Sequence, residues 1–118
     1  QAKKAPAAYL SWKMRRIVTD RVETAAEGLA TQVGYELTQE ILWDDLSDFI
    51  LVSEDVMKHA ILTYLELVRN LTEEAGAAPL AAALKIRERL RGEKIALILS
   101  GGNISLERLK TVLSLKTN

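Results

Sequence analysis

The residues with the clearest chemical potential form a short glycine-rich turn near the end of the chain, Ser100-Gly101-Gly102-Asn103. The turn directly follows an apolar run and precedes a helix-forming segment. Glycine lets the backbone turn sharply and lets a flat or anionic ligand approach without a Cβ in the way. Ser100 adds a hydroxyl that can donate and accept hydrogen bonds. These residue types fit a phosphate cradle or a contact to a planar cofactor. They also fit a plain turn of small residues, because one Gly-Gly pair is weak evidence for a site.

Other residue types that often carry chemistry have simpler structural explanations in this sequence. His59 follows Asp55 by four positions, which places both on one side of a helix. We interpret His59 as an exposed or half-buried residue paired with Asp55 rather than as a catalytic base. Trp12 and Trp43 fit either interface anchors, where aromatic residues are enriched, or core residues.

The spacing of the apolar residues predicts the elements that position the turn. Helices are expected over about 36–46, 54–75, 80–90 and 106–113, and buried strands over Phe49–Val52 and Lys94–Leu99. Ser53 and Ser105 can cap helices, because a serine hydroxyl satisfies a free backbone N–H. Gly76 and Gly92 are expected to end helices. Two stretches are less defined: Ala7–Met14 fits a short helix or an extended segment, and Glu23–Ala30 fits a loop leading into a helix.

Strands that alternate with helices predict an α/β fold, a partial parallel sheet with flanking helices. Two strands make a very narrow sheet whose edges are exposed unless other strands cover them. The sequence therefore indicates that the other half of the sheet lies outside these residues.

The composition excludes several classes of protein. The chain has 118 residues, no cysteine, one histidine, and 16 basic against 16 acidic residues, so its formal net charge is zero. A neutral balance argues against nucleic acid or an anionic membrane as the main partner. The lack of cysteine excludes disulfides and thiolate chemistry, and the apolar runs are too short to span a bilayer. The first residue is Gln, which with the short length suggests a fragment.

Three stretches, in this order, resemble one known family. They are Ala5–Lys13, Glu23–Ala30, and Glu73–Leu84 with the turn that follows the apolar run, Ser100–Ile104. Together they resemble the C-terminal region of the pyridoxal-phosphate-dependent threonine dehydratases, a group that includes serine dehydratases and serine racemase. The resemblance implies that residues 1–118 are the C-terminal portion of the catalytic domain of a fold type II pyridoxal-phosphate enzyme.

The resemblance also assigns a role to each candidate cofactor-binding residue. Ser100 would hydrogen-bond the pyridine nitrogen of pyridoxal 5'-phosphate, so that the turn with Gly101 and Asn103 meets the ring rather than the phosphate. Gly28 would approach the cofactor through its backbone, and Glu73 would lie on the nitrogen side of the ring. A hydroxyl does not hold that nitrogen protonated, which suits β-elimination over transamination. The simpler alternatives are that Gly28 only starts a helix and that Glu73 is a surface charge.

The sequence departs from the family pattern at several points. It has no Ser-x-Lys-x-Arg-Gly motif, which carries the imine lysine, and no glycine-rich phosphate loop. No catalytic residue is therefore expected in this chain, and the chain alone should be inactive. Gln1 and Ala7 stand where some relatives have the carboxylates that bind a divalent cation, so no metal site is expected. The acidic group at 44, 45 and 48 is more typical of a solvated loop than of a cation site.

The intact enzyme implied by the resemblance is a cytoplasmic threonine or serine ammonia-lyase. It would convert L-threonine or L-serine to 2-oxobutanoate or pyruvate plus ammonia, in isoleucine biosynthesis or threonine catabolism. The expected partners are the amino-acid substrate, the missing N-terminal half and further copies of the chain, with no nucleic acid and no membrane. Two alternatives remain open: an amino-acid racemase of the same fold, such as a serine racemase, and a non-catalytic partner-binding module.

Overall fold

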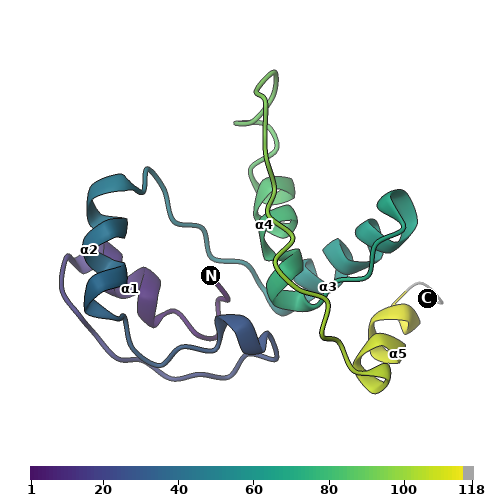
Figure 1. The fold of residues 1–118 in the computed structure, drawn as a ribbon, viewed down its shortest axis with the longest axis horizontal. Helices are drawn as coiled ribbons and strands as arrows, with labels where there is room; N and C mark the ends of the chain where they lie inside the picture. Colours follow the sequence, from purple (N-terminus) through teal and green to yellow (C-terminus); the bar gives the residue numbers. More distant parts are fainter. Residues whose placement is uncertain (116–118) are drawn as a thin grey trace. The chain divides into compact units, whose positions relative to one another are not determined.

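The computed structural model describes residues 1–115, and every element in that part of the chain is helical (Figure 1). The residues form two compact units, Gln1–Ser53 and the residues from Glu54 onward. The elements in chain order are α1 (Ala7–Met14), the 3₁₀ turn η1 (Glu27–Leu29), α2 (Glu36–Asp45), α3 (Glu54–Thr63), the π-helix η2 (Tyr64–Val68), α4 (Glu74–Lys85) and α5 (Leu106–Ser114).

The first unit is built around the packing of α1 against α2. The indole Nε1 of Trp12 donates to the carbonyl of Leu42 at 3.0 Å, and that of Trp43 donates to the carbonyl of Ser11 at 3.2 Å. Each tryptophan thus fastens one helix to the other, as expected for aromatic residues whose polar N–H finds a partner when partly buried. The structure selects the packing interpretation of both tryptophans, and the helical alternative for Ala7–Met14.

The prediction of a strand over Phe49–Val52 is wrong for this chain. Only Val52 pairs, in a single parallel bridge with Ala2. The bridge is made by Val52 N–H to the Gln1 carbonyl at 2.9 Å and Lys3 N–H to the Val52 carbonyl at 2.8 Å. A strand needs a continuing ladder of backbone partners, and the rest of this segment has no such ladder within residues 1–115. The parallel direction matches the expectation, but a sheet does not form.

The second unit packs α3 against α4 and α5. Its buried apolar side chains come from all three helices and from the π-helix: Met57, Ala60, Ile61, Leu62, Tyr64, Ala77, Ala78, Ala81 and Val112. This is the hydrophobic stripe expected of amphipathic helices that share one core.

Two predicted helix ends in this unit are wrong. The helix that begins at Glu54 ends with the π-helix at Val68, because Arg69 adopts a left-handed conformation with φ of 59°. Gly76 therefore lies inside α4 rather than at a helix end. The expected helix over Leu80–Leu90 is part of α4, which ends at Lys85 and continues as turns to Gly92, where φ is +86°. Only glycine adopts such a φ readily, so Gly92 ends the turns and not the helix.

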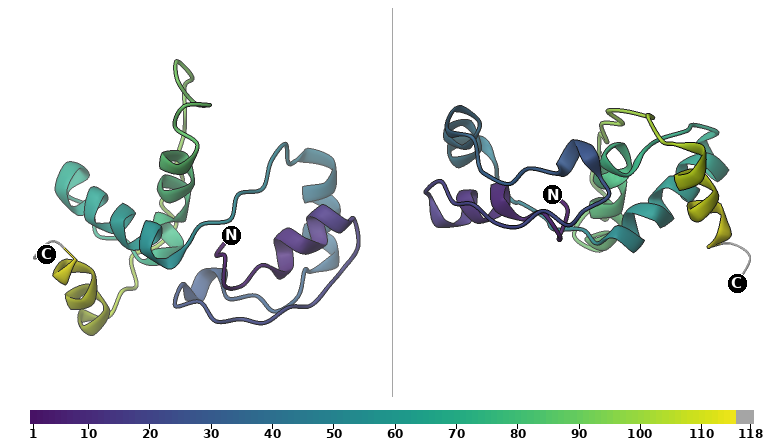
Figure 2. Two further views of the ribbon diagram at one scale, coloured as in Figure 1. Left: turned by 180° about the vertical axis from the view of Figure 1, so that it is seen from behind. Right: turned by 90° about the horizontal axis from the view of Figure 1, so that it is seen from below.

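The second strand, predicted over Lys94–Leu99, is also absent. These residues form an irregular segment that returns from the far end of α4 toward α5 (Figures 1 and 2). Ile95 is 49% exposed and Ile98 is 71% exposed, so the apolar side chains are not covered. The segment has the composition of a buried strand, but none of the described residues supplies a strand beside it.

Two smaller predictions have different outcomes. Ser105 caps α5 as expected, because its hydroxyl oxygen accepts a hydrogen bond from the N–H of Arg108 at 3.2 Å. His59 is exposed, but the carboxylate of Asp55 pairs with Lys58 at 3.2 Å instead. A flexible lysine three positions away reaches that carboxylate from the same helix face. Among the described helices, none combines the length and the apolar character needed to cross a membrane.

Candidate functional site

The turn Ser100–Asn103 is fastened to the start of α4 by its backbone. The carbonyl oxygen of Gly101 accepts two hydrogen bonds, from the N–H of Glu73 at 3.2 Å and from the hydroxyl of Thr72 at 2.9 Å. Thr72 is fully buried. A second short contact within the turn joins the N–H of Ile104 to the Gly102 carbonyl at 2.9 Å. The turn is therefore held by main-chain atoms and by one buried hydroxyl, not by its own side chains.

Close packing explains why small residues occupy this place. A Cβ built on Gly76 would lie 2.5 Å from the Gly101 carbonyl oxygen, and one built on Gly102 would lie 2.9 Å from the Leu71 carbonyl oxygen. A Cβ on Gly101 would meet the carboxylate of Glu73. Distances below about 3 Å are too short for a carbon atom, so the two backbones can approach each other only without side chains. The glycine pair brings the turn against the residues that lead into α4.

Three polar side chains at this junction are left available. Ser100 and Asn103 are exposed and Glu73 is half-buried. Within residues 1–115 none of these three side chains makes a hydrogen bond or ion pair. Glu73 occupies the N-cap position of α4, yet its carboxylate does not cap the helix. The site thus offers a hydroxyl, an amide and a carboxylate, which together can bind a polar heteroatom of a flat ring.

The sequence singled out Glu73 and the turn separately, and the structure brings Glu73 and Gly101 into contact across 28 positions of the chain. It was Thr72 that the sequence analysis missed. A threonine directly before an acidic pair and a helix is a common signal of a helix start, and that signal could have drawn attention to it. Here the hydroxyl donates to the Gly101 carbonyl rather than accepting a hydrogen bond from α4.

The remaining candidate, Gly28, belongs to the first unit, where it is exposed in the 3₁₀ turn η1. The turn is held in place by the side-chain amide of Gln1. The Nε2 atom of Gln1 donates to the carbonyls of Ala5 at 2.6 Å and Leu29 at 3.1 Å, and it lies 3.4 Å from the hydroxyl oxygen of Thr31. Gln1 therefore joins the first residues of the chain to both sides of η1. The loop expected over Glu23–Ala30 is confirmed, with one 3₁₀ turn in place of the start of a longer helix.

Metal ligation is not supported by any cluster of side chains in the part of the chain described. No group of three or more His, Asp or Glu residues comes together there. At the position where a carboxylate would be needed, the Gln1 amide donates to oxygen atoms, and the other such position, Ala7, is fully buried. Burial lowers the pKa of the α-amino group of Gln1, because a buried ammonium loses its hydration.

These residues fit one side of a pyridoxal-phosphate site. The exposed Ser100 hydroxyl can hydrogen-bond a ring nitrogen, and the Gly101–Gly102 backbone leaves space for a flat ring to approach. Lysines are present in the chain, but none stands in the motif expected for an imine. The fit therefore extends to the ring and not to the phosphate or the imine.

Comparison with known proteins shows a consistent class. A bacterial threonine deaminase, from T.th., superposes with a TM-score of 0.81 at 32% identity, over 89% of this chain and 38% of that one. Threonine deaminase isoform 2 from Solanum lycopersicum gives a TM-score of 0.86 at 26% identity, over 97% of this chain and 34% of that one. Maize serine racemase gives 0.82 at 28% identity, over 98% and 38%. These neighbours are fold type II pyridoxal-phosphate enzymes.

Sequence comparison identifies the family. The model of the pyridoxal-phosphate-dependent enzyme family matches residues 1–101, and the chain belongs to that family. The catabolic L-threonine dehydratase TdcB of Staphylococcus aureus (strain N315) is 36% identical over 104 residues, covering 84% of this chain and 30% of the relative. The chain thus spans about a third of the length of the proteins that it matches. The resemblance found in the sequence motifs is confirmed, and so is the dependence of the family on pyridoxal phosphate.

Proposed function

We propose that this chain is the C-terminal part of the catalytic domain of a threonine or serine ammonia-lyase. The observation that carries the proposal is the Ser100–Asn103 turn, which is fastened by its backbone and presents an uncommitted hydroxyl in a chain similar to threonine dehydratases. The overall reaction converts L-threonine to 2-oxobutanoate and ammonia, or L-serine to pyruvate and ammonia. The hydroxyl leaves as water, and a water molecule later replaces the amino group.

Each candidate residue has a binding or orienting role in this proposal. Pyridoxal phosphate supplies the electron sink that makes loss of the α-proton possible. Ser100 holds the ring nitrogen through a neutral hydrogen bond, and Glu73 and Asn103 border the same edge of the ring. Gly101 and Gly28 allow the backbone to come close to the cofactor. The groups that move protons are supplied by the rest of the domain.

The proposal also accounts for the uncovered strand-like segments. In the complete domain, Phe49–Val52 and Lys94–Leu99 become strands of a parallel sheet whose other strands come from outside these residues. Their exposed apolar side chains support this assignment, because both faces of a parallel sheet are normally covered. The N-terminal part of the domain is then the first partner of this chain. Assembly into a homo-oligomer and a cytoplasmic location complete the proposal.

Joining this chain to the N-terminal part of the Staphylococcus aureus dehydratase tests the proposed function. The expected result is a protein that binds pyridoxal phosphate, seen by its absorbance, and that releases keto acid from L-threonine. Ser100→Ala should lower the release roughly fivefold, since one hydrogen bond contributes about 1 kcal/mol. Ser47→Ala, an exposed serine in the first unit, is the matched control.

The same assay separates the competing functions. Formation of D-serine from L-serine without keto acid would replace the ammonia-lyase by a racemase. A joined protein that folds but binds no pyridoxal phosphate would contradict both enzymes and favour a partner-binding module. Equal activity of Ser100→Ala and Ser47→Ala would remove Ser100 from the proposed site.

A further inference from the structure

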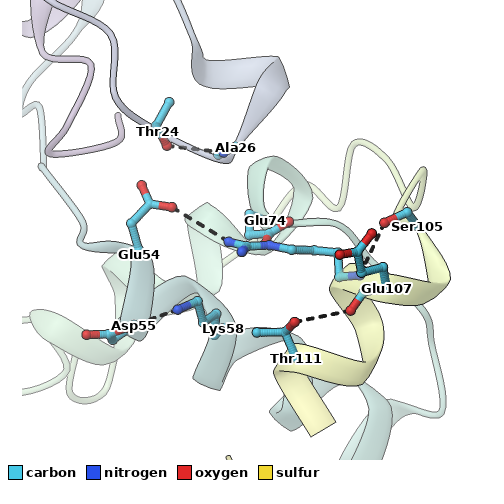
Figure 3. A network of polar contacts seen from close by, with 10 residues as sticks. Thr24, Ala26, Glu54, Asp55, Lys58, Glu74, Ser105, Glu107 and Thr111 are labelled. Carbon is cyan, nitrogen blue, oxygen red and sulfur yellow. Dashed lines mark hydrogen bonds and ion pairs between the residues drawn. The ribbon is translucent and has the colours of Figure 1, made fainter. Parts of the chain in front are cut away.

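Arg108 on α5 lies between two carboxylates that begin two other helices. Its Nε atom pairs with Oε1 of Glu74, the first residue of α4, and its Nη2 atom lies 3.9 Å from Oε2 of Glu54, the first residue of α3. Figure 3 shows Glu54 and Glu74 approaching this guanidinium group from their separate helices. One cation therefore connects three helices of the second unit.

The pairing is needed because Glu74 is buried. Its side chain is 5% exposed, whereas that of Arg108 is 30% exposed. A buried carboxylate without a partner is strongly destabilising, while a guanidinium group satisfies it through charge and hydrogen bonding together. The start of α4 adds a favourable dipole for Glu74. Arg108 is also fixed by its own backbone, because its N–H donates to the Ser105 hydroxyl at 3.2 Å.

This ion pair adjoins the candidate site. Glu73 directly precedes Glu74, and the N–H of Glu73 donates to the Gly101 carbonyl at 3.2 Å. The turn that contains Gly101 leads within a few residues to α5 and Arg108. The chain between the turn and α5 is thus attached to the start of α4 twice, at Gly101 and at Arg108.

We propose that Arg108 is a positioning residue for the candidate site. By neutralising Glu74, it fixes the start of α4 against α5 and so fixes the Glu73 carboxylate relative to the Ser100–Asn103 turn. Its consequence for catalysis rests on the proposed function, whereas its effect on the Glu73–Gly101 contact does not.

Hydrogen exchange in the 118-residue chain tests the positioning role without the cofactor. Arg108→Met should speed exchange of the Glu73 amide by roughly tenfold or more, because it leaves a buried carboxylate unpaired. The core amide of Ile61 serves as a reference and should change less. Arg108→Lys, which keeps the charge but loses the planar fork, should give an intermediate acceleration. Arg87→Met is the matched control, because Arg87 pairs only with the exposed carboxylate of its neighbour Glu88.

A double variant distinguishes positioning from general stabilisation. If Arg108 acts through Glu74, then Arg108→Met combined with Glu74→Gln removes the unpaired charge and should restore most of the protection at Glu73. Additive effects of the two changes would overturn the proposal. So would equal acceleration at Glu73 and Ile61, or no difference between Arg108→Met and the Arg87→Met control.

The joined protein described above gives the catalytic readout. Arg108→Lys should lower kcat about tenfold with KM for L-threonine changed less than about twofold, because Arg108 touches no substrate. An unchanged kcat in an active protein would overturn the catalytic part of the proposal. If the parent joined protein is itself inactive while the exchange results hold, the proposed function fails and the positioning role of Arg108 stands.

Discussion

The two units of this chain use their polar side chains in opposite ways. In the first unit, long-range hydrogen bonds from Gln1, Trp12 and Trp43 to backbone carbonyls fasten the segments together. Its buried apolar residues are four alanines and Val52. In the second unit, larger side chains such as Met57 and Ile61 form the core. The polar side chains beside its glycine turn remain uncommitted.

This difference indicates where chemistry can be located. A polar group that holds the fold together is not available to a ligand, and a core of alanines contributes little burial free energy per residue. The second unit obtains its stability from apolar packing and one buried ion pair. It can therefore leave Ser100, Asn103 and Glu73 free for binding.

The largest expected effect concerns association of the isolated chain through the uncovered segment of the second unit. Ile95 and Ile98 are exposed, and a chain with such unpaired apolar residues should self-associate or require a partner. Sedimentation should show a mass of at least about twice that of the monomer. Replacing both isoleucines by lysine should return the chain to a monomer. A monomeric wild-type chain with a cooperative thermal melt would contradict this prediction.

Truncation of the core of the second unit should have the next largest effect. Ile61 is fully buried, so Ile61→Ala should lower the free energy of unfolding by about 3 kcal/mol. The measurement is urea denaturation, performed on the monomeric lysine variant. Leu67→Ala is the control, because Leu67 is 78% exposed and its truncation should change stability by less than about 0.5 kcal/mol. Similar losses at both positions would show that this core is not packed as described.

The close approach of the turn to α4 gives a smaller expected effect. Gly76→Ala places a methyl group against the Gly101 carbonyl and the Thr72 hydroxyl, and this overpacking should cost about 2 kcal/mol. Gly92→Asn is the control, since no atom lies within 4 Å of a Cβ there and asparagine tolerates a positive φ. Urea denaturation measures both variants. A neutral Gly76→Ala would mean that the turn and the start of α4 lie farther apart.

The smallest expected effect comes from the first unit. Trp43→Phe keeps most of the aromatic surface but removes the hydrogen bond to the Ser11 carbonyl, so stability should fall by about 1 kcal/mol. Trp12→Phe removes the equivalent hydrogen bond to Leu42 and should give a similar loss. Losses as large as that of Ile61→Ala in both variants would erase the contrast between the two units.

The sequence predicted the features that depend on local chemistry. The cap at Ser105 and the helices around Glu36–Asp45 and Leu106–Ser114 are determined by residues close together in the chain, and they are confirmed. The family motifs also identified the turn and Glu73 as one candidate site. Whether these residues bind the cofactor stays a prediction.

The features that the sequence could not predict depend on distant partners. Phe49–Val52 and Lys94–Leu99 have strand composition, but a strand forms only when a neighbour supplies its hydrogen bonds. Gly76 resembles a helix-ending glycine, yet its role here is to let the Gly101 carbonyl come close, which no local pattern reveals. The pairing of Arg108 with Glu74 joins residues 34 positions apart and has no periodic signature.

The backbone attachment of the Ser100–Asn103 turn has a consequence for protein engineering. The hydrogen bonds that hold Gly101 end on main-chain atoms and on Thr72, so the identity of residue 100 does not enter them. A single codon change at this position could therefore present an acidic, thiol or amide group to a bound heterocycle while the surrounding scaffold stays the same. Reaction preference could be altered there independently of folding.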